Sequence, residues 1–118
     1  MLQFIRLIIF GNDINGLKNF YQSNFNLPVI EEIEGEWVVL NAGSIEIALH
    51  KIGLTYRDEA SFRAESNVKL VFSVDNLANQ RQELIKNGVK MKDIQFSAYC
   101  DGEDLEGNVF QLYQKTFH

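Results

Sequence analysis

The sequence predicts an α+β fold built from two βαβββ modules, and three observations carry this prediction. An apolar run, an amphipathic helical stretch and three short strand-like runs follow one another in the first half, and the same order returns in the second half. The pairs Phe10 and Phe72, and Asp13 and Asp75, relate the halves by a shift of 62 residues. A length of 118 residues suits one domain with a real core, and is too short for two ordinary domains.

The first module is expected over residues 1–50. Residues 2–10 are apolar and rich in isoleucine, which predicts a buried strand ending at Gly11. Asn12 or Asp13 can cap a helix after it, and Pro28 breaks the helical region because a residue before proline disfavours helix. Residues 29–33, 36–41 and 45–50 are separated by glycine-containing turns, so we expect an antiparallel meander. Helical spacing relates the apolar residues Ile14, Leu17, Phe20, Tyr21 and Phe25.

The second module is expected over residues 68–118, after a linker over residues 51–67 that holds six charged residues without sustained periodicity. Residues 68–74 predict a strand, Asp75 a helix cap, and Asn87-Gly88 the end of that helix. Strand-like runs follow at residues 90–94, 96–101 and 108–114. Together the modules and linker form one predicted domain, residues 1–118. The second helix presents Leu77, Arg81, Leu84 and Ile85 on one face.

Composition and charge argue against several classes of partner. A net charge of -5 and a pI near 4.9 are unlike a surface selected for nucleic acid or anionic membranes. No apolar run approaches the roughly 20 residues that cross a bilayer. The lone Cys100 cannot form an intramolecular disulfide, and the first residues lack the pattern of a signal peptide. We therefore expect a soluble, cytoplasmic protein that binds neither nucleic acid nor membrane.

Four short motifs occur in a defined order along most of the chain. Singly, each has an ordinary explanation in packing, capping or turn chemistry. Their order and spacing resemble the vicinal-oxygen-chelate superfamily, which contains glyoxalases, bleomycin resistance proteins and dioxygenases. The last motif resembles the family's Asp-Pro-Glu-Gly-Asn turn, with Leu105 in place of proline. The motifs are Phe20-Tyr21, Gly43 to His50 (GSIEIALH), Phe72 to Asp75 (FSVD) and Asp104 to Asn108 (DLEGN).

The resemblance implies a glyoxalase/bleomycin resistance-like fold, in which the two modules form a curved mixed sheet around a cavity and the helices lie outside. In metal-dependent members, a divalent metal in that cavity chelates neighbouring oxygens of the substrate. Members usually pair into dimers. The resemblance thus implies a homodimer and a small-molecule ligand.

The same resemblance places metal ligands, usually His or Glu and occasionally Gln, at four positions that here hold Arg6, Ala48, Lys69 and Gln111. Arginine and protonated lysine have no lone pair to give, and alanine has no donor atom, so only Gln111 could coordinate a metal. An alignment shifted by two residues would admit Glu46 or His50, but nearby cations would repel a divalent ion. We therefore expect neither a metal site nor a cofactor.

Alternation along the strands predicts which side chains share a face with those positions. Arg6 and Lys69 would form internal ion pairs, with Glu46 as one candidate partner, or would recognise an anionic ligand. For the aromatic residues and His50, core or rim positions are the alternative to ligand contact. Cys100 is expected to be a small buried hydrophobe. The candidate ligand-binding residues are Arg6, Trp37, Glu46, His50, Lys69, Tyr99, Gln111 and Tyr113.

Three functions remain open. The leading hypothesis is a protein that binds a small organic molecule without a metal, with an anionic ligand as one option. The second is a glyoxalase-like lyase or isomerase, with Glu46 as a weak candidate for the catalytic base and Gln111 as the surviving metal ligand. The third is a non-catalytic interaction module. Because one scaffold hosts several chemistries, the fold alone does not decide whether the protein is an enzyme.

Overall fold

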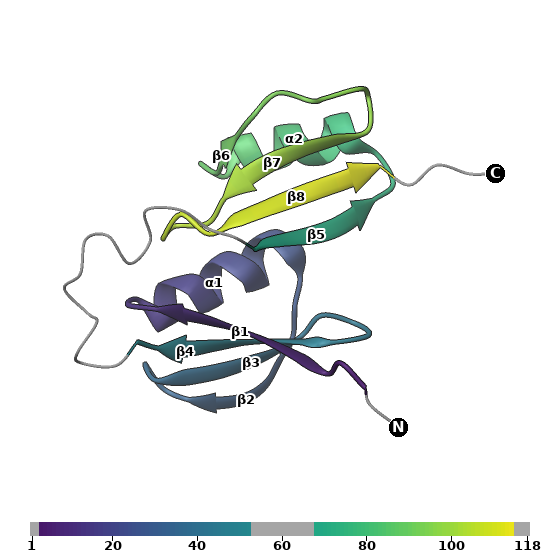
Figure 1. Ribbon diagram of the computed structural model, residues 1–118. Coiled ribbons are helices and arrows are strands. Elements are labelled where there is room, and N and C mark those ends of the chain that lie inside the picture. Colours follow the sequence, from purple (N-terminus) through teal and green to yellow (C-terminus); the bar gives the residue numbers. More distant parts are fainter. Residues whose placement is uncertain (1–2, 53–67, 115–118) are drawn as a thin grey trace. The chain divides into compact units, whose positions relative to one another are not determined.

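The computed structural model describes residues 3–52 and 68–114 (Figure 1). The chain divides into two compact units, Met1–Ala60 and Ser61–His118, which we call module 1 and module 2. The expected linker at residues 51–67 starts with Lys51, which is the last residue of a strand, and residues 53–67 lie outside the described part. Within its described residues, each module contains one helix and one four-stranded sheet.

Module 1 has the predicted βαβββ order. Strand β1 (Arg6–Gly11) is followed by helix α1 (Ile14–Phe25) and by β2 (Val29–Ile33), β3 (Trp37–Asn41) and β4 (Glu46–Lys51). The sheet order is β1-β4-β3-β2, with β1 parallel to β4 and the other neighbours antiparallel. The first strand begins at Arg6, later than the apolar run that starts at residue 2.

Helix α1 covers one face of the module 1 sheet. It starts because the Asp13 carboxylate accepts a hydrogen bond of 2.9 Å from the Gly16 amide, and it ends at Asn26, which has a left-handed φ of 56°. The helix contacts β3 and β4. The buried apolar side chains of this layer are Ile14, Leu17 and Tyr21 from the helix and Val38, Leu40, Ile47 and Leu49 from the sheet.

Module 2 repeats the order with β5 (Lys69–Val74), α2 (Leu77–Lys86), β6 (Lys90–Met91), β7 (Tyr99–Glu103) and β8 (Val109–Gln114). Its sheet order is β5-β8-β7-β6, and β5 is parallel to β8. The predicted α+β class with two βαβββ modules is therefore confirmed. Neither α1 nor α2, the helices of the described part, has the length and apolar character needed to cross a membrane.

Two strands of module 2 are shorter or later than predicted. β6 has only two residues, although the run at residues 90–94 predicted a longer strand. β7 begins at Tyr99 and not at Phe96, because Phe96 and Ser97 both have positive φ angles, 52° and 55°, which no extended strand adopts. These two residues form the turn that precedes β7.

The predicted cap of the second helix is wrong by one residue. The N-cap of α2 is Asn76, whose side chain accepts a hydrogen bond of 3.0 Å from the Asn79 amide. Asp75 lies one position before the cap, too early to bond to the first turn in the way that a capping side chain does. The corresponding residue of module 1, Asp13, is the N-cap as predicted.

The offset between the modules is accordingly 63 residues in the first strand and helix cap, not 62. Ile8 pairs with Ala48 in module 1, as Val71 pairs with Gln111 in module 2. In this register Phe10 does not correspond to Phe72, which lies on the opposite sheet face of its own module, since successive strand residues point to opposite faces.

Candidate functional site

Each sheet has one face under its own helix and a second face that points away from it, which we call the helix-free face. In module 1 the strand register places alternate residues of three strands on this face, as the sequence predicted for β1 and β4. The residues of the helix-free face of module 1 include Arg6, Ile8, Phe10, Trp37, Val39, Glu46, Ala48 and His50.

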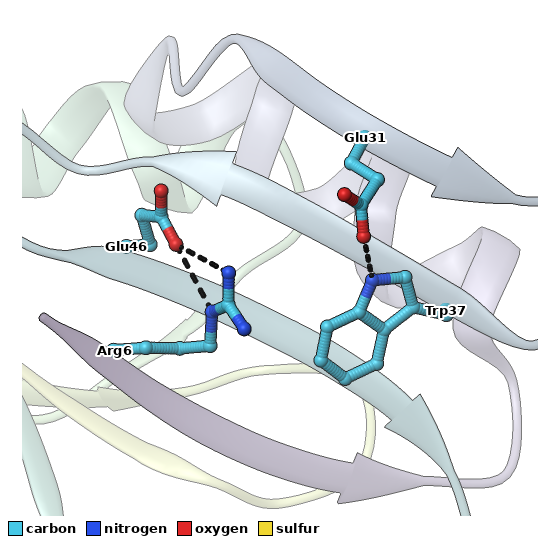
Figure 2. Close-up of polar contacts among 4 residues, drawn as sticks. All are labelled: Arg6, Glu31, Trp37 and Glu46. Carbon is cyan, nitrogen blue, oxygen red and sulfur yellow. Dashed lines mark hydrogen bonds and ion pairs between the residues drawn. The ribbon is translucent and has the colours of Figure 1, made fainter.

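An ion pair between neighbouring strands lies on this face. Arg6 donates through Nε and Nη2 to Oε1 of Glu46, at 3.0 and 2.8 Å, so the predicted pairing of Glu46 with a cation is confirmed (Figure 2). The guanidinium carbon lies 5.5 Å from the centroid of the Trp37 ring, within cation–π range. The two charged side chains are 35% and 32% exposed, so the pair is reachable from solvent. Nη1 of Arg6 has no hydrogen bond to any described residue.

Aromatic rings continue this surface beside the ion pair. The indole nitrogen of Trp37 donates to Glu31 at 2.6 Å (Figure 2), and the ring meets His50 edge-on with centroids 5.4 Å apart. Phe10 contacts the other side of His50, at 5.5 Å between centroids. The structure thus brings together four predicted residues of module 1, namely Arg6, Trp37, Glu46 and His50.

Two members of this cluster were not among the candidates. Phe10 was detectable, because it shares the alternation of Arg6 in β1. Glu31 was not, because the pairing of β2 with β3 shifts register between Val29 and Glu31, and simple alternation fails across such a bulge.

In module 2 the helix-free face carries a different polar network. Lys69 donates to Oδ2 of Asp101 at 2.8 Å, and the amide nitrogen of Gln111 donates to Oδ1 of the same carboxylate at 3.0 Å. Tyr99 and Tyr113 lie opposite each other on β7 and β8. All four candidates of module 2 therefore share one face. Asp101 was missed, although its spacing of two from Tyr99 places it there.

Asp101 is held as a carboxylate by this network. Partial burial would by itself raise its pKa, but the hydrogen bonds from Lys69 and Gln111 and the positive charges of Lys69 and Lys92 outweigh burial, and the pKa is lowered. The Lys69 and Asp101 side chains are 43% and 23% exposed, so solvent screens the pair. Asp101 is consequently an anchor for Lys69.

The motif Asp104 to Asn108 and the lone cysteine have structural roles. The buried Asp104 accepts hydrogen bonds from the backbone amides of Glu106 and Asn108 and from the Asn108 side chain, at 2.7 to 2.9 Å. Gly107 completes the turn with a φ of 84°.

Cys100 is fully buried, and burial is the main cause of its raised pKa. The charge of Arg81 partly offsets this rise, and the charge of Asp101 adds to it. Cys100 has the environment of a small core residue and not of a nucleophile.

Two βαβββ modules, each with a mixed four-stranded sheet and a polar helix-free face, define a class of α+β proteins built from a repeated module. The sequence matches the Glyoxalase/Bleomycin resistance protein/Dioxygenase superfamily over residues 3–108. The match covers most of the chain, so the protein belongs to this superfamily, and the vicinal-oxygen-chelate resemblance and the fold that it implied are confirmed.

Solved structures from several bacteria show the same fold. A lactoylglutathione lyase from Agrobacterium tumefaciens is 14% identical, with 95% of this chain and 92% of that chain covered and a TM-score of 0.75. TnmS3, an antibiotic binding protein from Streptomyces sp. CB03234, is 16% identical, with 98% of both chains covered and a TM-score of 0.72. The fosfomycin resistance protein FosX from Listeria monocytogenes is 18% identical, with 99% and 94% covered and a TM-score of 0.71. A comparison with curated proteins finds no match.

The residues at the family's metal-ligand positions do not fit a metal. In module 1, Arg6 is bonded to Glu46, and the fully buried Ala48 has no donor atom. In module 2, Lys69 is bonded to Asp101, and Gln111 gives its amide nitrogen to the same carboxylate. Residues 3–52 and 68–114 contain no group of three His, Cys, Asp or Glu side chains placed to hold an ion. Arg6 and Lys69 thus place positive charges at two of the four positions where metal-dependent members have ligands.

Proposed function

We propose that this protein binds a small organic anion without a metal, and that the helix-free face of module 1 supplies the main contacts. The observation that carries the proposal is the half-exposed guanidinium of Arg6 beside the Trp37 ring, with Nη1 free of hydrogen bonds to the described residues. For module 2 we propose Lys69, Tyr99, Gln111 and Tyr113 as ligand contacts of that module's own helix-free face.

The arrangement suits an anion with a flat apolar part. Glu46 and Trp37 hold the guanidinium in place before a ligand arrives, which lowers the entropy lost on binding. A guanidinium donates to a carboxylate with good geometry, and an indole ring offers a flat surface for stacking. Ile8 and Phe10, which are 41% and 44% exposed, extend the apolar surface beside the charge.

The relatives support a binding role without requiring it. TnmS3 is described as an antibiotic binding protein, whereas the lyase from Agrobacterium tumefaciens is an enzyme of the same fold. For this chain the ligand positions favour binding over a metal-dependent lyase, because Arg6 and Lys69 are cations and Gln111 is engaged by Asp101. In this proposal Glu46 orients Arg6. The homodimer and the cytoplasmic location stay predictions.

A test uses benzoate and its uncharged isostere benzamide on the full-length protein in the presence of EDTA. Trp37 is the only tryptophan, so its indole N–H resonance reports directly on the proposed face. We expect benzoate to shift this resonance saturably and benzamide to bind at least tenfold more weakly, since a hydrogen bond to a charged group is worth about 1.5–3 kcal/mol.

Matched variants separate a site from general electrostatics. Arg6→Gln should weaken benzoate binding about tenfold or more and leave the weak benzamide response unchanged. Lys18→Gln removes a cation that is paired with Glu32 and belongs to α1, and should leave both ligands unaffected. Equal binding of benzoate by the wild type and Arg6→Gln, or no saturable shift at all, would overturn the proposal.

A further inference from the structure

A hollow of about 380 Å³ lies within module 2, and Lys69 is the one proposed ligand contact among the described residues that line it. Its volume falls in the range of small-molecule sites. The residues come from all four strands of the sheet and from the position after β6. Those that line it in the described part of the chain are Lys69, Lys90, Lys92, Asp101, Gly102, Glu103 and Val109.

The charged groups around this hollow leave one positive charge in excess. Lys69 and Asp101 neutralise each other, and the second carboxylate oxygen of Asp101 is taken by Gln111. Lys90 and Lys92 form no ion pair with residues 3–52 or 68–114. Glu103 lies opposite Lys90 in the register without an ion pair. Among the described lining residues, two ammonium groups and one carboxylate thus have no ion pair within the described part, in a protein whose net charge is -5.

The wall of the hollow is mainly carbon. Val109 supplies a branched apolar side chain, and Lys90 and Lys92 are exposed residues whose side chains combine an apolar methylene stem with a charged end. A lysine ammonium is a compact charge and lacks the planar set of donors of the arginine guanidinium. It therefore recognises the charge of an anion more than its shape. The hollow thus combines an apolar interior with a cationic rim.

We infer that module 2 binds a short-chain monocarboxylate in this hollow. Its apolar tail packs on Val109 and the lysine stems, and its carboxylate lies between Lys90 and Lys92. One negative charge cancels the excess of one positive charge, whereas a cation of the same length is repelled. Neither Arg6 nor Trp37 is among the described residues that line the hollow, so the benzoate response of Trp37 and the binding of hexanoate are measured separately.

The experiment titrates full-length protein with acetate, butyrate and hexanoate, followed by calorimetry and by backbone amide resonances. Affinity should rise two- to fourfold for each added methylene group, because each buries apolar surface in the hollow. Hexanol, which has the tail without the charge, should bind at least fivefold more weakly than hexanoate, and hexylamine should not bind. Resonances of residues 90–92, 101–103 and 109 should shift.

The double variant Lys90→Gln/Lys92→Gln should weaken hexanoate at least fivefold, leave hexanol unchanged, and keep the benzoate response of Trp37. A control, Lys51→Gln/Lys86→Gln, removes two lysines that do not line the hollow and should behave as the wild type. Urea unfolding checks that both variants stay folded. The inference is overturned if hexanoate binds no better than acetate or hexylamine, or if the control weakens hexanoate as much as the test variant does.

Discussion

Arg6 and Lys69 occupy equivalent positions in the two modules, yet their counter-ions come from different strands. Arg6 pairs in register with Glu46 of β4, and its partner is therefore the adjacent residue. The residue in register with Lys69 is Val109, which cannot neutralise a cation. Lys69 instead reaches across β8 to Asp101 of β7. The two modules therefore neutralise equivalent cations through different strands.

The Lys69 and Asp101 pair predicts an acid-dependent part of stability. Because the pKa of Asp101 is lower in the folded protein than in the unfolded chain, its ionised form stabilises the fold above the unfolded pKa near 4. That stabilisation is lost as pH falls below about 4 and through the folded pKa. It should amount to no more than about 1 kcal/mol, since Lys69 is 43% exposed and the pair is screened.

Urea unfolding of Asp101→Asn between pH 6 and pH 2 measures this contribution. The variant should be less stable than the wild type at pH 6, and the difference should shrink toward zero in the most acidic samples. Asp93→Asn serves as the control, because the side chain of Asp93 is 94% exposed and its ion pair with Arg81 spans 3.5 Å. A difference that stays constant or grows as the solution is acidified contradicts the assignment.

Residue-level prediction succeeded for Glu46, which alternation places on the same face as Ala48, and it missed Asp101 and Glu31. The pairing of Glu46 with a cation followed from alternation together with the family's strand order. Asp101 and Glu31 gain their roles from the register of β7 with β8 and from a bulge in β2. Alternation cannot reveal Glu31 across the bulge, whereas Asp101 shares the alternation of Tyr99 and was overlooked.

At the scale of elements, the helix caps give a test of the corrected module offset. Asn76→Ala should destabilise the protein by about 1 kcal/mol, because it leaves the Asn79 amide without its capping bond. Asp75→Ala, one residue earlier, should cost only a few tenths of that amount, since the Asp75 side chain does not cap the helix. Equilibrium unfolding of both variants compares them, and a larger cost for Asp75→Ala would restore the original assignment.

Element existence was well predicted, and the errors lie where backbone conformation is unusual. The helices and most strands follow apolar periodicity, which records burial on one face. The start of β7 could not be predicted, because Phe96 and Ser97 take positive φ angles without glycine or asparagine to signal them. The Asp104 turn was predictable, because its aspartate, glycine and asparagine each have a local role.

At the scale of the whole molecule, the repeat explains why the metal positions can be compared between modules. Arg6 and Ala48 of module 1 are separated from Lys69 and Gln111 of module 2 by the same 63 residues that separate the helix caps. Arg6 in β1 thus corresponds to Lys69 in β5, and Ala48 in β4 corresponds to Gln111 in β8, when the strand registers of the two modules are compared. Arg6 and Lys69 place a cation at the equivalent position of each module, so the expectation of no metal site rests on both halves of the chain.

Metal analysis and native mass spectrometry of untagged protein test this conclusion together with the expected homodimer. We expect well below one metal ion per chain and a native mass of twice 13.6 kDa. Adding 1 mM zinc, nickel or manganese should leave the melting temperature unchanged, because a site with micromolar affinity would stabilise the fold by about 4 kcal/mol at that concentration. A stoichiometric metal, or a large shift with one of these ions, would instead favour the metal-dependent lyase.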